Sequence, residues 1–250
     1  MTTTPVFFGS GTLIMKRTDI ANPTPVTVGI MQEVQIDFDF TNKELIGQNQ
    51  FPVDVARGQG KITGKAKFAL IYGQTMNDMF FGDTLTKSSG VAAALLEAHS
   101  VPSSSTYTVT VTHAADFVAD EGVFYSATGL PLYRVAAGAE VTGAYSVDEA
   151  TGIYTFAAGD ASAALLFNYT YDVTTMIKIT GNNKLMGSSP VFEVLLAESY
   201  KGNVLNVKLF QAISTKMSFP FKNGDHSIQD FEFAAYANQA GNVYEITTSQ

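Results

Sequence analysis

The sequence predicts an all-β protein with one or two short helices, and three observations lead to that class. Apolar and polar residues alternate over 33–40 and again over 61–71, which is the pattern of strands with one buried face. Later apolar runs are separated by the turn dipeptides Gly-Asn and Asn-Gly. The 250 residues are 46% hydrophobic, with 18 Phe and 11 Tyr, which is enough for a sizeable core without any Cys.

The first two predicted strands carry opposite charges on their polar sides. The polar side of 33–40 consists of Glu33, Gln35, Asp37 and Asp39, and its apolar side of Val34, Ile36, Phe38 and Phe40. The polar side of 61–71 consists of Lys61, Thr63, Lys65 and Lys67, and its apolar side of Ile62, Gly64, Ala66, Phe68 and Leu70. If the strands pair antiparallel, an acidic row meets a basic row, and each opposite-charge pair contributes about 0.2–1 kcal/mol. The alternative is an ordinary solvated sheet face.

Between these two strands the sequence predicts a loop over 41–60. Loops longer than roughly 12–15 residues in compact domains are usually functional or disordered. The stretch 51–55, Phe-Pro-Val-Asp-Val, is too apolar for a loop that is free in solvent. We therefore expect the loop to pack on another copy of the chain, through Gln48, Phe51, Pro52, Val53 and Val55.

Further elements follow in order along the chain. Over 72–85 the alternation stops, and the spacing of Met76, Met79, Phe80 and Leu85 indicates a helix or helical turn against the sheet. An Ala-rich run over 91–99 indicates a second helix. Later strands are predicted over 191–197, 204–210, 215–221, 228–235 and 243–247, with turns at 202–203, 223–224 and 241–242. Together with the first two strands they indicate a β-sandwich core.

The segment 101–173 differs in character from its flanks. It begins with a Ser-rich stretch typical of a linker, and it contains alternating runs at 107–111 and 165–171 and a hairpin over 145–156 that turns at 148–152. This pattern predicts a small, immunoglobulin-like β-sandwich. The segment holds eight acids and one base, a charge of −7, whereas the remainder holds 15 acids and 14 bases, a charge of −1. We therefore predict two domains, 1–100 with 174–250 and an inserted acidic module over 101–173.

The composition favours a protein that assembles with copies of itself. Charged residues make up 15% of the chain, well below the roughly 25% of typical soluble proteins, so much of the surface is neutral and suited to burial against neighbours. The net charge of −8 disfavours tight nucleic-acid binding but permits transient passage of DNA. There is no apolar run of membrane-spanning length, and Met1–Pro5 lacks the features of a signal peptide, so we expect an intracellular protein and no membrane partner.

The candidate catalytic and metal-binding motifs fail on spacing. The run 58–65 resembles a phosphate-binding loop, but only five residues separate Gly58 from Gly64, and Ala66 stands where Ser or Thr would hold magnesium. The acidic stretch that starts at Asp37 lacks the Gly and Glu of a calcium loop. The three histidines, His99, His113 and His226, are isolated in the sequence and are expected at the surface. We therefore expect no enzymatic activity, no cofactor and no metal.

Two parts of the chain carry recognisable strand and turn patterns, one over 11–17, 34–40 and 60–71 and the other over 215–221, 230–233 and 241–244. The first part resembles the amino-terminal half of the tail tube proteins of tailed bacteriophages, and the second is similar to their closing strands. The stretch 145–171 also resembles a module that recurs in phage virion proteins. The insert over 101–173 departs from the compact family pattern.

The resemblance implies packed sheets with a flanking helix, joined into hexameric rings that stack into a hollow tube through which DNA leaves the virion. The implied partners are other copies of the chain, a sheath protein, and tail terminator or baseplate proteins. The implied location is the virion tail, assembled in the host cytoplasm. The insert would then decorate the outer surface.

Within such a tube, the polar side of the two charged strands is the candidate lumen face. A basic wall would hold DNA through its phosphates, whereas an acidic or mixed wall would not. The candidate residues are Glu33, Gln35, Asp37 and Asp39, with Lys61, Lys65 and Lys67 offset by the neighbouring acids. The other reading places this face on the outer surface.

Other functions remain open at this point. One is a different virion component, such as a decoration or head-tail connector protein. Another is a carbohydrate-binding or adhesin β-sandwich, for which exposed Trp is typical, although the chain contains none.

Overall fold

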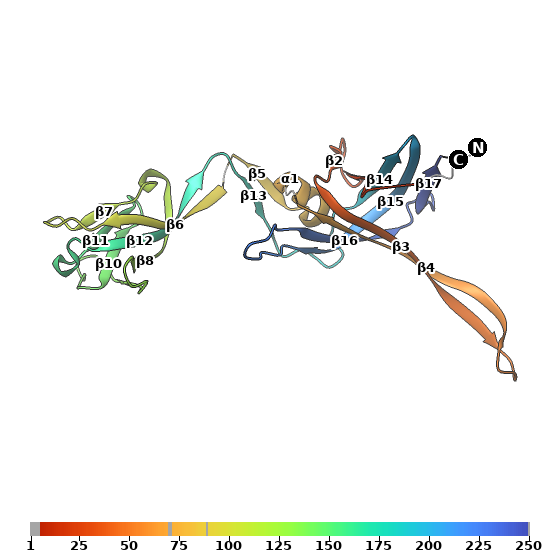
Figure 1. Ribbon diagram of the computed structural model, residues 1–250, viewed down its shortest axis with the longest axis horizontal. Coiled ribbons are helices and arrows are strands. Elements are labelled where there is room, and N and C mark those ends of the chain that lie inside the picture. The colour runs from red at the N-terminus through yellow and green to blue at the C-terminus, as the bar shows by residue number, and fades with distance from the viewer. Residues whose placement is uncertain (1–5, 70–71, 89, 250) are drawn as a thin grey trace. The chain divides into compact units, whose positions relative to one another are not determined.

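The computed structural model describes residues 6–69, 72–88 and 90–249. Met1–Pro5, and the last two positions of the strand predicted over 61–71, lie outside the described residues. The chain forms two compact units: unit 1 is Met1–Leu85 with Ile179–Gln250, and unit 2 is Thr86–Lys178 (Figure 1). Both consist mainly of antiparallel strands, so the predicted all-β class with a short helix is confirmed.

Unit 1 contains one eight-stranded sheet in the order β2-β1-β14-β15-β16-β4-β3, with β17 also paired to β15. Its strands are β1 (Thr12–Arg17), β2 (Val26–Thr27), β3 (Met31–Ile46), β4 (Pro52–Phe68), β14 (Phe192–Tyr200), β15 (Asn203–Ser218), β16 (Gln229–Tyr236) and β17 (Tyr244–Thr248). The amino-terminal half of β15 pairs with β14 and β17, and its carboxyl-terminal half pairs with β16. One strand therefore links both halves of the sheet.

Three of the later strands lie where the sequence predicts them, namely β14, β16 and β17. The strands predicted over 204–210 and 215–221 are parts of one strand, β15, which runs unbroken from Asn203 to Ser218, so the predicted break between them and the predicted end at 221 are wrong. A register shift between Ser214 and Lys216 interrupts the alternation there, which hides the continuity of the strand from a sequence pattern.

The predicted loop over 41–60 is also wrong. β3 and β4 stay paired from Met31↔Phe68 to Ile46↔Pro52, which leaves only Gly47–Phe51 as the turn of a long hairpin. From Phe40 onward both faces of the hairpin are exposed, so burial imposes no alternation on the sequence. Figure 1 shows this end of the hairpin extending beyond the rest of unit 1, in orange.

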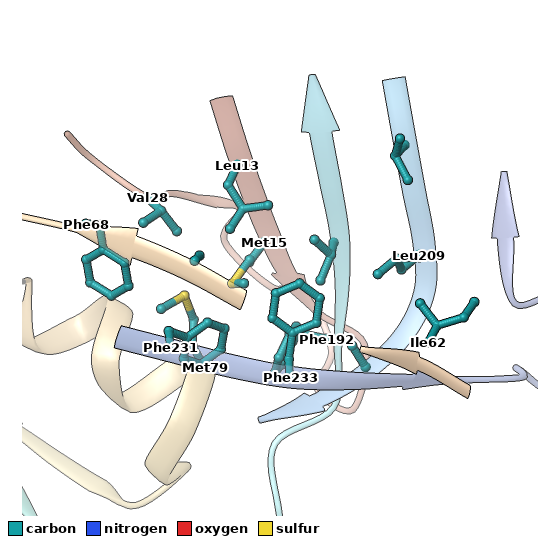
Figure 2. Close-up of a cluster of buried hydrophobic side chains, with 14 residues drawn as sticks. Leu13, Met15, Val28, Ile62, Phe68, Met79, Phe192, Leu209, Phe231 and Phe233 are labelled. Carbon is teal, nitrogen blue, oxygen red and sulfur yellow. The ribbon is translucent and has the colours of Figure 1, made fainter. Parts of the chain in front are cut away.

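A helical segment covers the core of unit 1, as the sequence predicts for 72–85. It consists of α1 (Gly73–Met76) and the π-helical turn η1 (Asn77–Phe81), and the chain then enters β5 (Thr84–Lys87). Figure 2 shows Met79, from η1, beside Phe231 of β16 within the cluster of buried side chains. Gly64 is required in this core, because a Cβ there would lie 2.0 Å from the ring of Phe233.

Unit 2 is built from two further sheets, ordered β7-β11-β10-β9 and β6-β12-β8. The strands are β6 (Gly90–Ser100), β7 (Thr108–Thr110), β8 (Phe117–Tyr125), β9 (Tyr133–Arg134), β10 (Ala144–Asp148), β11 (Ile153–Phe156) and β12 (Ala164–Val173), with 3-10 turns η2 (Ala114–Asp116) and η3 (Ala158–Asp160). The unit has its own core, in which Tyr154, Phe167 and Tyr169 are fully buried. β5 pairs with β13 (Ile177–Thr180) in a separate two-stranded sheet. The hairpin over 145–156 is confirmed as β10 and β11.

The helix predicted over 91–99 is wrong, because this segment is strand β6, paired along β12. Ala favours helix intrinsically, but pairing in a sheet overrides the weak local preference. Unit 2 consequently begins and ends outside the predicted insert 101–173, since β6 belongs to it. No helix among the described residues is long and apolar enough to cross a membrane.

Candidate functional site

The polar face shared by β3 and β4 is the first candidate surface. The expected antiparallel pairing of the acidic and basic rows is confirmed, with Glu33 opposite Lys67, Gln35 opposite Lys65, Asp37 opposite Thr63 and Asp39 opposite Lys61. Glu33 and Lys67 form an ion pair at 2.5 Å, and Gln35 donates a hydrogen bond to Asp37 at 2.9 Å. The sheet therefore places opposite charges side by side along its exposed face.

β16 adds a second acidic row that the sequence reasoning missed. Asp230 lies opposite Lys67 on β4, and Glu232 lies opposite Lys65. On the far side of β16, Lys216 of β15 lies 3.6 Å from Glu232. The signal in the sequence is the alternation of these two acids with buried Phe231 and Phe233, which fixes them on the polar face. Lys67 therefore lies between acids on both neighbouring strands, whereas Lys65 lies opposite an acid on β16 and Lys61 opposite an acid on β3.

The charges on this face nearly cancel. Among the described residues it carries five carboxylates and four lysines, a net charge of −1: Glu33, Asp37, Asp39, Asp230 and Glu232 against Lys61, Lys65, Lys67 and Lys216. The hydrogen bond and attraction between Lys67 and Glu33 raise the pKa of the lysine and lower the pKa of the carboxyl group. These groups are exposed, so dissolved salt weakens their attraction.

The far end of the β3–β4 hairpin is the second candidate surface, here called the hairpin tip: Leu45, Ile46, Gln48, Phe51, Pro52, Val53 and Val55. The predicted residues Gln48, Phe51, Pro52, Val53 and Val55 all lie in it. Phe51 is 79% exposed and Val53 70%, and Leu45, Ile46 and Val55 are exposed as well. Contiguous exposed apolar side chains are typical of surfaces that contact another macromolecule.

The three histidines have different surroundings. His99 contacts Glu97, His113 stacks on Tyr171 with ring centroids 3.8 Å apart, and His226 lies in an exposed turn. Within residues 6–69, 72–88 and 90–249, no group of three or more His, Asp and Glu side chains is arranged to hold a metal ion.

Buried carboxylates in unit 2 are each held by tyrosine hydroxyls. Asp120 accepts hydrogen bonds from Tyr145 at 2.7 Å and Tyr154 at 2.9 Å, and Asp160 accepts one from Tyr125 at 2.6 Å. Burial and the bond to Asp160 raise the pKa of Tyr125 to about 12, and burial likewise raises the pKa of Tyr145 and Tyr154. These hydroxyls keep their protons at neutral pH and tie strands together.

The chain matches no protein-family model, and no curated protein matches it. The two surfaces that point to a function are the near-neutral polar face and the apolar hairpin tip.

Proposed function

We propose that the protein is a structural subunit that assembles with copies of itself into the tube of a phage tail. The observation that carries the proposal is the β3–β4 hairpin, a long paired element that ends in exposed apolar side chains. Such a surface is unfavourable in water and is stabilised when a neighbouring subunit covers it. That the assembly is a tube is inferred from the resemblance of segments 11–17, 34–40 and 60–71 to tail tube proteins.

The polar face supports the second half of the proposal, a channel that lets DNA pass. Each of its lysines lies opposite a carboxylate on β3 or on β16, so the face offers no continuous basic strip to the phosphates of DNA. A near-neutral wall neither holds DNA by releasing counterions nor repels it strongly. In the proposed tube this face lines the lumen.

Electron microscopy of the purified full-length chain, with light scattering over a concentration series, tests the proposal. We expect rings and stacked tubes at high concentration. The matched control replaces residues 43–56 by Asn-Gly. Because Lys43 pairs with Ala56, this shortening keeps the register from Asn42↔Arg57 inward and removes the tip. The shortened chain should stay monomeric and folded. A wild-type chain that remains monomeric at every concentration contradicts the proposal.

A further inference from the structure

An apolar pocket of about 360 Å³ lies in unit 1 where the hairpin leaves the rest of the sheet. Three exposed aromatic side chains, Phe40, Tyr236 and Tyr244, line it together with Ile62 and Val243. They come from β3, β4, β16, β17 and the connection before β17. Here it is called the root pocket.

The aromatic side chains of the root pocket are held in place by their neighbours. Tyr244 packs edge-on against Phe38, with ring centroids 5.0 Å apart. The ring of Phe40 lies over Gly60, where a Cβ would come within 2.8 Å of it, and the Arg57 guanidinium lies 4.0 Å above the same ring. The pocket is therefore formed before anything enters it, which lowers the entropic cost of binding.

The hairpin tip of the same chain cannot reach this pocket. Phe40 lines the pocket, and Ile46 lies at the far end of the same strand, six residues further on, which corresponds to roughly 20 Å of extended chain. β3 and β4 remain paired over this whole distance, which keeps the tip away from the pocket of its own chain. An apolar tip and an apolar pocket thus occupy opposite ends of one paired element.

We propose that the root pocket receives the hairpin tip of a second copy of the chain, with Phe51 entering among the three aromatic side chains. The charges agree with this pairing, because Lys61 lines the pocket and the acidic Asp54 lies three residues from Phe51. This inference rests on the proposed function, since it names the surface on which the tip packs.

The contact is heterologous, because the tip and the pocket are different surfaces of the chain. Repeated contacts of this kind close into a ring or continue as a stack. A buried Phe accounts for about 150–250 Å², well below the roughly 1,000 Å² of a stable interface. A single tip–pocket contact is therefore weak and gains strength only within an assembly that repeats it.

Cysteine crosslinking tests the contact directly, because the natural chain contains no Cys. Two single variants of the full chain, Val53→Cys in the tip and Ala237→Cys beside the pocket, are mixed under assembling conditions and treated with a short bismaleimide. Both positions are exposed, and Phe51 is left intact. The control partner is Leu185→Cys, which is 90% exposed and lies outside the pocket. We expect the tip–pocket crosslink to exceed the control crosslink at least about tenfold.

The possible outcomes separate the two proposals. Rings or tubes in which Val53→Cys crosslinks equally well to Leu185→Cys, or mainly to itself, overturn the root pocket and leave the proposed function standing. Absence of any assembly overturns both.

A filled pocket gives a second readout that needs no crosslinker. Ala237→Trp places a large ring at the mouth of the pocket and should abolish assembly while the melting temperature of the monomer stays unchanged. Leu185→Trp, the matched control, should assemble like the wild type. Normal assembly of Ala237→Trp overturns the inference.

Discussion

Glu97 of β6 collects four hydrogen bonds on one carboxylate. Tyr169 donates at 2.6 Å, the backbone and hydroxyl of Thr112 at 2.8 and 2.9 Å, and His99 contacts it at 2.5 Å. Burial works to raise the pKa of Glu97, but the bonds from Tyr169, His99 and Thr112 outweigh burial and lower the pKa to about 2. The charged form of this side chain therefore stabilises unit 2.

The first prediction concerns this carboxylate and pH. Its folded pKa lies below the ordinary value of 4.5, so its contribution is present above pH 4.5 and is lost as the pH falls toward 2. Glu97→Gln should lower the free energy of unfolding on the order of 1–3 kcal/mol at pH 6. The difference from wild type should shrink between pH 4.5 and 2. Hydrogen exchange of the β6 and β12 amides in the full chain measures this difference in stability. The control variant is Glu121→Gln, at an exposed position of the same unit. A difference that does not change with pH contradicts the role.

At the scale of elements, the polar face of β15, β16, β4 and β3 depends on strand order. β4 carries the lysines, and it lies between two strands that carry acids. Exchanging the acids of β3 for lysines would therefore turn the outer half of this face into a basic strip. That change alters charge and leaves the buried side of the strand untouched.

The double variant Asp37→Lys with Asp39→Lys tests whether this face lines the lumen. Tubes assembled with short duplex DNA at about 50 mM salt should retain nuclease-protected DNA, and about 200 mM salt should release it. Wild-type tubes have no basic strip in the lumen and should retain no DNA. The same result is expected for tubes of the control variant, Asp116→Lys with Glu121→Lys, which adds lysines to unit 2 and not to this face. Bound DNA that nuclease digests would place the face on the outside of the tube.

At the scale of the whole molecule, unit 2 is closed around its own core. Its two sheets are built only from residues 90–173, and its aromatic core residues pack on each other, as in the edge-on contact of Tyr154 and Phe167 at 4.9 Å. A unit with its own sheets and core has the features of an independently folding domain.

Replacing residues 88–176 by a Gly-Ser linker of about six residues should leave unit 1 folded and able to assemble. This excision retains β5 and β13 and removes β6 together with its partner β12. A cut at 101 and 173 would instead leave β6 without that partner and expose its paired edge. Circular dichroism and electron microscopy measure folding and assembly. A truncated chain that fails to fold would show that unit 1 depends on unit 2.

How much of the fold and of the two candidate surfaces could be predicted from the sequence depends on where one face of a strand is buried. Val34 to Phe38 and Ile62 to Phe68 have a buried or half-buried side, and their alternation predicts both strands and the row of opposite charges. Beyond Phe40 the hairpin has no buried side, so the same two strands look like a loop. Phe51, Pro52, Val53 and Val55 of the tip could still be selected from the sequence, because their apolar character does not depend on secondary structure, whereas Leu45 and Ile46 were missed.

The remaining misses come from long-range pairing. β6 is a strand only because β12 lies beside it, and β12 starts more than sixty residues later. The acids of β16 reach the lysines of β4 only through a strand order that no local pattern encodes. The root pocket likewise combines β3 and β4 with a segment near residue 240. Non-local contacts of this kind leave no periodic signal in a single sequence.

The order of the strands also determines when each strand pairing can form during synthesis. β1 cannot pair with β14, nor β4 with β16, until β14 and β16 are translated, which happens only after unit 2. At about 5–20 residues per second, the 160 residues that separate β4 from β16 (69–228) impose a delay on the order of ten seconds, during which unit 2 can fold on the ribosome. The β3–β4 hairpin is made early, but the root pocket needs residues 235–244. A nascent chain therefore has a hairpin tip long before it has a root pocket. Under the proposed docking, its tip can bind the pocket of a completed copy, but it cannot yet bind the tip of another copy.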